Sequence, residues 1–530
     1  MAPKAGIPEE ILSFLHSSGG HSLIVKGSAG TGKTTFALQL AEELGGINRS
    51  FYMSTRVSDA SLFHQFPWLQ ERLRQTGIEI AGRRFTKTID EHAVHREGET
   101  DISVEIRVRG ESKPSEGSKH RLDRTELEKL EGRIEMGQEG DETYERHGEG
   151  QISEGGLVID IGADLPEIDM AYAAVERNLP EKTLILIDSI NALNERYGLH
   201  ASKLINTLQK DLVEKGKANI VYTLEESGPS RLDYLGDGVI TFESREHLGR
   251  RLRVMTIEKL RGTEVRQHKF LYTLDGARLR GFRIESAGRA ATRGEWRPVP
   301  DLSKDIVSSG NEAIDKLIGG LHRSRVVCFE FGANVPTEYV DNLRLGIVCN
   351  FSSLGRGIAH VPPRKGSLDQ LKEIVAGHLP AGAFDQHVRV FETTSLGGLE
   401  APKGALHMEG SSVDSDLKWS NVEYHLPKSV HPFLSMPSFD TLESVYGDDV
   451  LEELSGHIAA VRRQGDVFVG LTTPLTHSNA KLASTAYQHI RVENLDGSIV
   501  LYGEKPHTVF HNLSFTFEGG YPRAELTPIV

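Results

Sequence analysis

The sequence has little cysteine, few aromatic residues and no long apolar run. Its two cysteines, Cys328 and Cys349, are too few for a disulfide framework, and we expect both to be small buried residues in strands. No apolar stretch approaches the roughly 20 residues of a membrane-spanning helix, and the first residues lack the charged-then-apolar pattern of a secretory signal. We therefore expect a cytoplasmic protein with no membrane association.

Net positive charge is also missing. The formal net charge is −14 at pH 7, whereas proteins that bind nucleic acid neutralise phosphates with an excess of Lys and Arg. Direct DNA binding is therefore not expected as the main task, although a local basic patch stays open. The length of 530 residues suits roughly two to four globular domains.

A phosphate-binding pattern stands near the N-terminus. The letters GSAGTGKTT fit GxxxxGK[ST], and they lie between an apolar segment, SLIVK, and a stretch with helical spacing that ends before Gly45 and Gly46. In this context glycines let main-chain N–H groups converge on phosphate oxygens at a helix N-terminus. The predicted nucleotide-binding residues are Gly27, Ser28, Ala29, Gly30, Thr31, Gly32, Lys33, Thr34 and Thr35.

The expected ligand is ATP with Mg²⁺. Lys33 would reach the β- and γ-phosphates, Thr34 would bind the metal, and Thr35 would bond a further phosphate oxygen. Asp188 follows the apolar run Leu184–Ile187, at the strand end where ligands bind in open parallel sheets. We predict that it holds the water shell of the metal and acts in catalysis, and the alternative is a cap of the following helix.

These motifs, together with DGVI at 237–240 and KLRGT at 259–263, resemble the RecA superfamily and its KaiC/RadA-like branch. Within that branch the chain is most similar to the archaeal gas vesicle protein D (GvpD) family, well over residues 8–285 and loosely beyond. We predict an α/β fold of two RecA-like P-loop NTPase-type domains with mainly parallel sheets. The nucleotide-binding domain spans 1–285, a linker 286–301, and a second domain 302–530.

Two segments depart from a plain pair of such domains. Residues 86–156 are dense in Glu, Arg and Gly, and we expect a charged, partly disordered insertion that serves either as a regulatory arm or as a solvated spacer. The second half echoes the first, but FGANVPTEYV has no GK[ST]; Pro336 or Thr337 stands near the place of Lys33, and Pro437 near that of the acid. We therefore expect the second domain to be degenerate, without a nucleotide site.

The catalytic set also departs from the family pattern. Where RecA-like ATPases place a water-orienting glutamate, this chain has Arg56, which stays protonated and cannot act as a general base. Arg56 either contacts the γ-phosphate or makes a surface ion pair. Glu225 and Glu226 follow the strand expected beside that of Asp188, and they are the nearest substitutes, as water-polarising acids, phosphate sensors or structural residues.

Two basic groups remain. Lys259 and Arg261 resemble the cations that KaiC-like rings present to a neighbouring subunit's nucleotide. That role implies a homo-oligomer or a stacking of the chain's own two domains, and the alternative is a solvated basic strand. In LGRRLRV, we consider Arg250, Arg251 and Arg253 as part of a patch that contacts a partner or the nucleotide.

Two functional hypotheses follow. The first is an ATP-binding regulatory protein of the KaiC-like/GvpD type, a nucleotide switch with slow or no ATP hydrolysis that controls a protein partner. The resemblance implies a partner that is a transcription regulator, and repression of gas vesicle gene expression. The second is an active, ring-forming KaiC/RadA-like ATPase. We favour the first because of Arg56 and the missing second phosphate loop.

Overall fold

The structure is a computed structural model that describes residues 6–44, 49–54, 59–69, 79–80, 166–284, 288, 293–364, 366–393 and 403–530. The described residues of Met1–Arg84 and Asp169–Val530 form one compact unit. The second unit, Phe85–Ile168, lies almost wholly outside the described residues, and with it the expected insertion at 86–156. Arg56 is likewise outside them.

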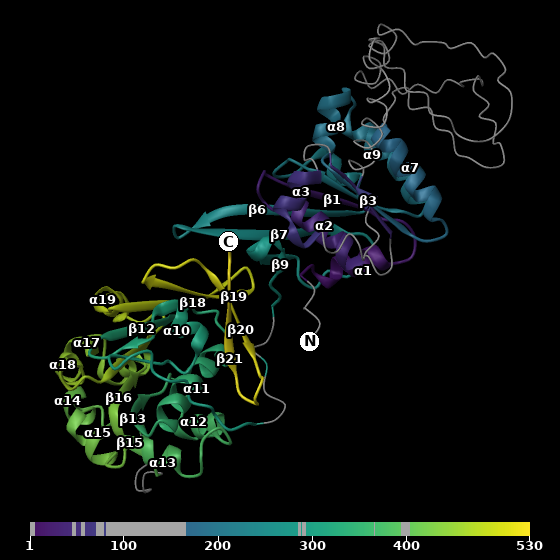
Figure 1. Cartoon of the computed structure of the whole chain (residues 1–530). Coiled ribbons are helices and arrows are strands. Elements are labelled where there is room, and N and C mark those ends of the chain that lie inside the picture. The colour runs from purple at the N-terminus through teal and green to yellow at the C-terminus, as the bar shows by residue number, and fades with distance from the viewer. Residues whose placement is uncertain are drawn as a thin grey trace, which may run out of the picture. The chain divides into compact units, whose positions relative to one another are not determined.

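The first sheet of the described residues has nine strands (Figure 1). Its central strands are parallel, because β1 pairs in parallel with both β5 and β6, and its last strands run antiparallel. In sheet order the strands are β3 (Glu79–Ile80), β2 (Arg49–Ser54), β4 (Thr183–Asp188), β5 (Asn219–Leu224), β1 (Ser22–Gly27), β6 (Gly238–His247), β7 (Arg250–Leu260), β8 (Lys269–Thr273) and β9 (Arg280–Gly281).

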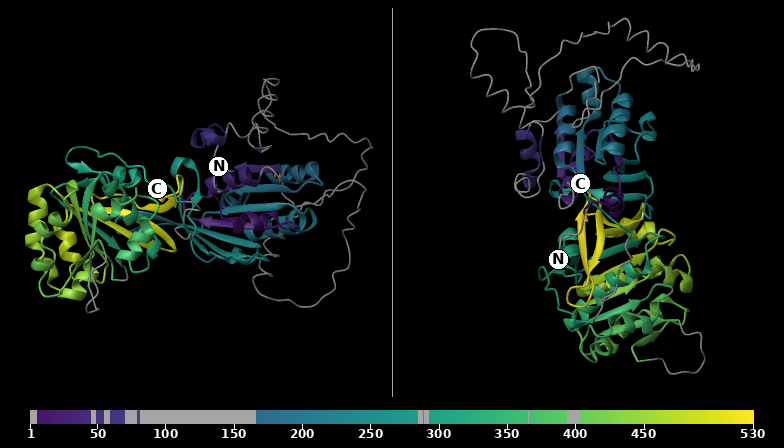
Figure 2. Two further views of the ribbon diagram at one scale, coloured as in Figure 1. Left: turned by 90° about the horizontal axis from the view of Figure 1, so that it is seen from below. Right: turned by 90° about the vertical axis from the view of Figure 1, so that its right-hand side faces the viewer.

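Helices cover this sheet on both faces, as Figure 2 shows. Leu23 and Val25 of β1 share one apolar cluster with Phe36 of the helix that follows, while Ile24, which points to the other face, is buried as well. The strands therefore read as continuous apolar runs, which is typical of parallel sheets buried on both sides. The helices of this half are α1 (Glu9–His16), α2 (Lys33–Leu44), α3 (Asp59–Gln65), α7 (Pro166–Asn178), α8 (Ile190–Tyr197) and α9 (Ala201–Leu208).

The second sheet of the described residues has ten strands. It too is parallel at its centre, where β12 pairs with β17 and β18, and antiparallel from β18 onward. In sheet order the strands are β15 (Ala405–His407), β14 (Val388–Glu392), β13 (Arg356–Val361), β16 (Val430–Pro437), β17 (Val467–Thr472), β12 (Val326–Phe331), β18 (Gln488–Leu495), β19 (Ser498–Lys505), β20 (His511–Thr516) and β21 (Arg523–Pro528).

Two apolar clusters cover the two faces of this second sheet. Val327 and Phe329 belong to the cluster that includes α11, whereas Cys328 between them belongs to the cluster that includes α16 and α18. A small ladder of β10 (Ile306–Val307) and β11 (Leu321–His322) precedes the sheet. The helices are α10 (Glu312–Ile318), α11 (Thr337–Ser353), α12 (Leu368–Val375), α13 (Ala383–His387), α14 (Val413–Asp416), α15 (Trp419–His425), α16 (Phe439–Tyr446), α17 (Val450–Glu453), α18 (Ser455–Gln464) and α19 (Asn479–Thr485).

The two sheets repeat the same strand order. The order in the first sheet is β2-β4-β5-β1-β6-β7-β8-β9, and the corresponding order in the second is β13-β16-β17-β12-β18-β19-β20-β21. Corresponding strands also follow one another along the chain in the same succession. The loops that follow β1 and β12, residues 28–32 and 332–336, are equally long. The predicted α/β class with mostly parallel sheets is confirmed, while the RecA-like assignment and the domain limits stay predictions.

One expectation about the core is wrong. Cys328 is buried in β12 as expected, but Cys349 is buried in the helix α11 and not in a strand. A short apolar run around a cysteine fits a buried helix as well as a strand, and periodicity does not separate the two. Within the described residues, no helix combines the length and the apolar character needed to cross a membrane.

Candidate nucleotide-binding site

The site is built where β1 ends and α2 begins. Two glycines of the loop at 28–32 adopt backbone angles that disfavour other residues, with φ of +77° at Gly30 and +95° at Gly32. A Cβ at Gly32 would also lie 2.8 Å from Cδ2 of Leu274. The main-chain N–H of Phe36 donates to the carbonyl of Gly32 at 2.8 Å, which opens the helix directly after the loop. The predicted strand, loop and helix are thus present in that order.

Lys33 lies inside the loop. Its side chain is buried, with 6% exposure, and Nζ donates to the carbonyl oxygens of Gly27 at 2.8 Å and Ser28 at 2.9 Å. An ammonium group held by loop carbonyls at a helix N-terminus places positive charge where phosphate oxygens would bind. The donor set therefore fits the phosphate chain of a nucleotide.

Asp188 ends β4 and collects three hydroxyl groups. Thr34 donates to its Oδ2 at 2.7 Å, Tyr52 to the same oxygen at 2.9 Å, and Thr223 to Oδ1 at 2.6 Å. The carboxylate is thus oriented from α2, β2 and β5, which is the support that an outer-shell metal ligand needs. Thr34 and Asp188, the two residues predicted to share the metal, lie in direct contact.

Tyr52 and Thr223 are further functional candidates, which the sequence motifs do not identify. Burial and the neighbouring charge of Asp188 raise the pKa of Tyr52 well above its ordinary value, so its hydroxyl stays protonated and keeps donating. Both residues lie near the carboxyl ends of strands that flank β4. That rule of strand ends could have found Thr223, but Tyr52 reads in the sequence as an ordinary core aromatic.

Two side chains from the antiparallel strands β7 and β8 donate hydrogen bonds to the main chain of the loop. Tyr272 of β8 donates from its hydroxyl to the carbonyl of Thr31 at 2.5 Å, and Arg253 of β7 donates from Nη1 to that of Gly30 at 3.0 Å. The sequence predicts Arg253 only as part of a patch that contacts a partner or the nucleotide. Arg250 and Arg253 are in fact buried, while Arg251 is exposed, so these three arginines do not form one open surface patch.

Glu225 and Glu226 follow β5 at the same edge of the sheet as Asp188 and the loop. Glu225 is exposed, and its main-chain N–H donates to Oδ1 of Asn191 at 2.9 Å, while Glu226 is half-buried. The chain that follows the two glutamates is held by buried Lys26, which donates to the carbonyl of Gly228 at 2.8 Å and to Asp233 at 2.5 Å. Both glutamates thus lie beside the site, and their catalytic role stays a prediction.

Lys259 and Arg261 lie at the opposite edge of the sheet. Leu260 between them pairs with Gly238, which in turn pairs with Leu23 at the start of β1. The length of β1, about 17 Å at the usual rise per residue, separates them from the loop. Lys259 donates to the main-chain oxygen of Asp233, and Arg261 bonds Asp237 at 3.1 Å. These cations do not join the nucleotide site of their own chain.

The corresponding place in the second half has different chemistry. Pro336 precedes α11 and lacks an N–H, and Thr337 opens the helix where Lys33 opens α2. Pro437 pairs with Val361 at the ends of β16 and β13, as Asp188 pairs with Ser54 at the ends of β4 and β2. The predicted loss of both the lysine and the acid therefore falls at the corresponding positions of the second sheet.

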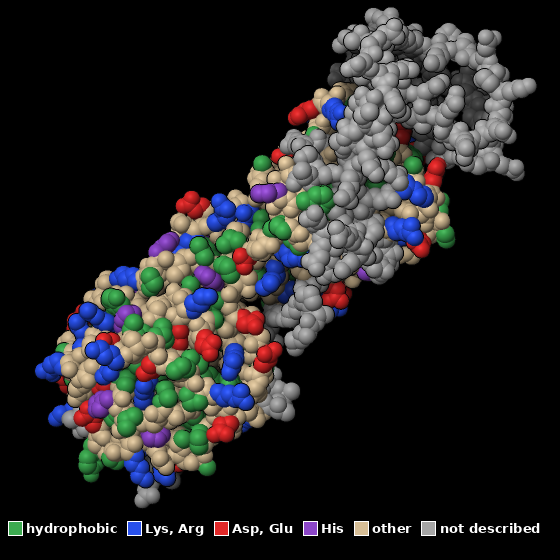
Figure 3. Space-filling model, in the orientation of Figure 1, with side chains coloured by type: hydrophobic (Ala, Val, Ile, Leu, Met, Phe, Trp, Pro, Cys, Tyr) green, Lys and Arg blue, Asp and Glu red, His purple; other side chains and the backbone are tan. Residues whose placement is uncertain are grey.

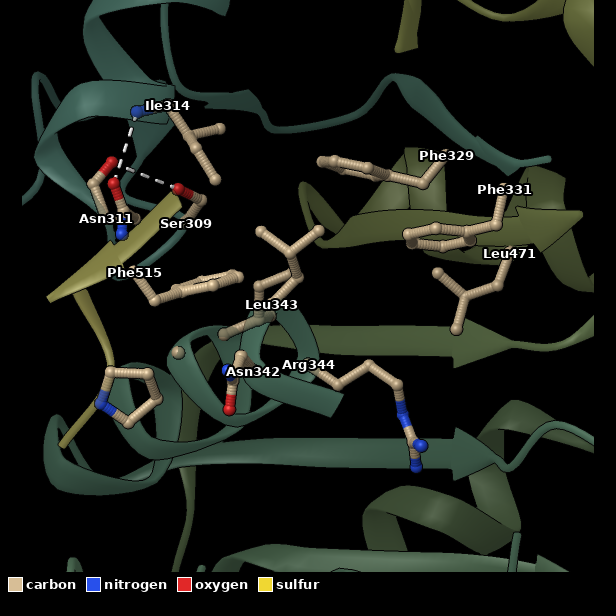
Figure 4. Close-up of a pocket in the computed structure, with 13 residues that line it drawn as sticks. Ser309, Asn311, Ile314, Phe329, Phe331, Asn342, Leu343, Arg344, Leu471 and Phe515 are labelled. Atoms are coloured by element: carbon tan, nitrogen blue, oxygen red, sulfur yellow. Dashed lines mark hydrogen bonds between the residues drawn. The ribbon is translucent and has the colours of Figure 1, made fainter. Parts of the chain in front are cut away.

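A small cavity in the second half does not replace the missing site. Phe329, Phe331 and Leu343 line it together with Asn342, and Figure 4 shows Arg344 with its guanidinium group directed away from the aromatic rings. The cavity has a volume of about 20 Å³, which holds roughly one water molecule. A nucleotide needs far more room than this cavity offers.

Comparison with known proteins agrees with this site. Residues 11–91, which include β1, the loop and α2, match the family described as "GvpD gas vesicle protein, P-loop domain". The chain resembles GvpD-like P-loop proteins. Protein GvpD2 of Halobacterium salinarum is 23% identical over 99% of this chain and 97% of its own length. Protein GvpD1 of the same organism is 23% identical over 99% of this chain and 96% of its own length.

The similarity to the GvpD proteins extends through both halves of the chain, whereas the family match covers only residues 11–91. A P-loop domain implies nucleotide binding with Mg²⁺ in general. Within the described residues, no group of three or more His, Cys, Asp and Glu side chains is placed to hold a metal by itself. A Mg²⁺ ion would thus depend on Thr34, Asp188 and the nucleotide phosphates, which is its usual mode of binding.

Proposed function

We propose that this protein is an ATP-binding regulatory switch that controls a protein partner, with slow or no hydrolysis. One observation carries the proposal: Thr34 and Asp188 are in direct hydrogen-bond contact beside a loop whose interior already holds the ammonium group of Lys33. Gly27 to Thr35 would hold the phosphates of ATP, and Thr34 with Asp188 would hold Mg²⁺ and its water. The bound phosphates supply the charge that orders neighbouring loops.

Slow hydrolysis is supported by the residue at the end of β2. Ser54 pairs there with Asp188 as the last residue of β2, and the place of the family's glutamate falls on Ser54, Thr55 and Arg56. A serine hydroxyl is a poor general base at neutral pH. Glu225 and Glu226 remain the candidate acids, from β5 on the other side of Asp188.

The second half supports a role in transmitting the bound state. Its sheet repeats the strand order of the first, but the loop at 332–336 and Pro437 lack phosphate-binding chemistry. On the face seen in Figure 3, acidic and basic side chains are interspersed over this half, which favours a protein partner over DNA. We propose that the partner is a transcription regulator and that the outcome is repression of gas vesicle genes in the cytoplasm.

The alternative is a ring-forming ATPase, and one observation favours it. Arg261 lies at the strand ends opposite the loop, and although it pairs with Asp237, 62% of its side chain is exposed and can face a second copy of the chain. A cation supplied by a neighbour stabilises charge that develops on a transferring phosphate. In that arrangement Lys259 and Arg261 would complete the site of the adjacent subunit.

ATP affinity and ATP turnover, measured on the same preparation, separate the two proposals. The switch predicts saturable binding of ATP with Mg²⁺ and turnover below about 0.01 per second, since complete sites run at about 1 to 100 per second. Turnover near one per second that is lost in Glu225→Gln or Glu226→Gln would favour the ring ATPase. The same holds if Arg261→Ala removes turnover and leaves ATP affinity unchanged.

A further inference from the structure

We infer that Arg253 is a positioning residue that couples the nucleotide loop to the end of the second half, so that ATP binding and the packing of β19–β21 against β7 and β8 are linked. This inference rests on the proposed function, because it assigns a way in which the bound state of the loop reaches the second half.

Arg253 contacts both partners directly. Its side chain is buried, with 6% exposure; Nη1 donates to the carbonyl of Gly30 at 3.0 Å, and Nε donates to the main-chain oxygen of Val530 at 2.5 Å. Its guanidinium carbon lies 6.0 Å from the ring centre of Tyr272, whose hydroxyl holds Thr31. Consecutive carbonyls of the loop are therefore fixed from β7 and β8, and one of these anchors also holds the last residue of the sequence.

Along the chain, Arg253 stands between Leu252 and Val254 and its partner Val530 follows Ile529, and these three neighbours belong to one apolar cluster shared by both halves. Arg250, also buried, donates from Nε to the carbonyl of Thr508 at 2.7 Å and stacks its guanidinium 4.6 Å from the ring centre of Tyr502. The main-chain N–H of Ile529 donates to the carbonyl of Phe510 at 2.8 Å. The buried members of the cluster are Leu252, Val254, Leu271, Phe282, Val500, Tyr502, Phe510 and Ile529.

The bonds of Arg253 provide a physical route by which the nucleotide loop and Val530 affect each other. The orientation of the peptide after Gly30 decides whether the neighbouring N–H groups face a phosphate, and that same carbonyl accepts from Arg253. A planar guanidinium can hold two oxygens in fixed directions at once, which an ammonium group does less well. A shift of the loop on ATP binding therefore changes the bond to Val530, and loosening of the cluster changes the loop in return, because such linkage is reciprocal.

The test uses the full chain, a fluorescent ATP analogue with Mg²⁺, and hydrogen–deuterium exchange of residues 523–530 with and without ATP. In the unmodified protein, ATP should slow exchange in this segment. Arg253→Lys keeps the charge and should lower ATP affinity about tenfold and abolish the ATP-dependent protection. Arg280→Lys on β9, which is exposed, makes the same chemical change outside the bridge and should match the unmodified protein.

Phe510→Leu provides a second variant, because it changes the shared cluster and leaves every residue of the loop and Arg253 in place. Linkage predicts that it weakens ATP binding about threefold to tenfold. The inference is overturned if Arg253→Lys retains the ATP-dependent protection, or if Phe510→Leu binds ATP as tightly as the unmodified protein. Failure of the unmodified protein to bind ATP would instead refute the proposed function itself.

Discussion

The loops after β1 and β12 hold the same place in sheets of the same strand order, yet only the first has phosphate-binding chemistry. One loop carries glycines at positive φ and a lysine at the start of its helix. The other has Pro336 before its helix, and Pro437 stands at the end of β16, the place that corresponds to Asp188. The comparison teaches that the sheet does not depend on the loop, because its strands are held by apolar packing on both faces.

The two halves also differ in the buried charged residues near the ends of β1 and β12. In the first half Lys26 near the end of β1 pairs with Asp233, whereas in the second Glu330 near the end of β12 bonds His489 at 2.9 Å and Arg491 at 3.1 Å. Burial by itself would raise the pKa of Glu330, but the hydrogen bond from His489 and the charge of Arg491 outweigh it and lower the pKa. The buried charge of Glu330, near the end of β12, is thus balanced by side chains of the neighbouring strand β18.

The largest expected effect is at Lys33. Lys33→Ala should lower ATP affinity about 100-fold, because a charged donor to the phosphates is worth up to about 3 kcal/mol. A titration should also give one ATP per unmodified chain. Lys203→Ala, an exposed lysine on α9, serves as the control and should bind normally. Two ATP molecules per chain would break the comparison between the loops, since the second loop would then be a working site.

The next effect concerns Asp188. Asp188→Asn removes the charge and keeps only one oxygen that can accept from the hydroxyl groups, because an amide NH2 takes the place of the other. Support of this kind is worth about 10- to 100-fold in metal affinity. We expect the Mg²⁺-dependent part of ATP affinity to fall about 30-fold, measured by titration with Mg²⁺ and again with EDTA. Equal Mg²⁺ dependence in the variant and the unmodified protein would remove Asp188 from the metal site.

A third prediction concerns pH and the second half. Burial, aided by the charge of Arg344, holds the pKa of His360 well below its ordinary 6.5, and the neutral ring bridges Arg344 and the carbonyl of Met436. The unfolded chain therefore takes up a proton below pH 6.5 that the folded chain does not, so stability is full above 6.5 and falls as the pH drops.

Between pH 7.5 and 5.5 we expect this histidine to lower the free energy of unfolding by about 1.4 kcal/mol. Urea unfolding of the full chain at both pH values, compared with His360→Gln, measures the difference. His16→Gln, an exposed histidine of α1, should leave the pH dependence unchanged. An identical pH dependence in His360→Gln and the unmodified protein would show that the ring is protonated in the fold.

The smallest expected effect is at Tyr52. Tyr52→Phe removes one of the three hydroxyl bonds to Asp188 and leaves the packing, so ATP affinity with Mg²⁺ should fall only about threefold. Tyr222→Phe on β5 is the matched control, since this tyrosine is equally buried but directed to the opposite face of its sheet from Val221. A loss as large as that of Asp188→Asn would instead give Tyr52 a direct part in binding.

Much of the first half could be predicted from the sequence. The segment SLIVK corresponds to β1, and the stretch with helical spacing that ends before Gly45 corresponds to α2. Thr34 and Asp188 were predicted to hold Mg²⁺ together, and they lie in direct contact, because a P-loop and an acid at a strand end meet at the carboxyl ends of a parallel sheet. Their role at the metal stays a prediction. These features depend on local residue spacing, so they can be predicted without knowledge of the fold.

Other features needed the structure. Arg250 and Arg253 read as a basic patch, but burial between residues distant in the sequence turns them into internal bridges. Tyr52 reads as core and proves to hold Asp188. Cys349 read as a strand residue and lies in α11. In each case the partner lies far along the chain, and periodicity says nothing about such partners.

The sequence by itself determined the phosphate loop, its lysine and threonines, the acid at 188, and the absence of that chemistry from the second half. These are properties of residue type and local spacing, which act over one strand, one loop and one turn of helix. Only the tertiary structure decided which hydroxyls orient Asp188, which carbonyls of the loop are held, and that Arg253 joins the loop to Val530. Those contacts depend on strand order and burial, which bring together residues hundreds of positions apart.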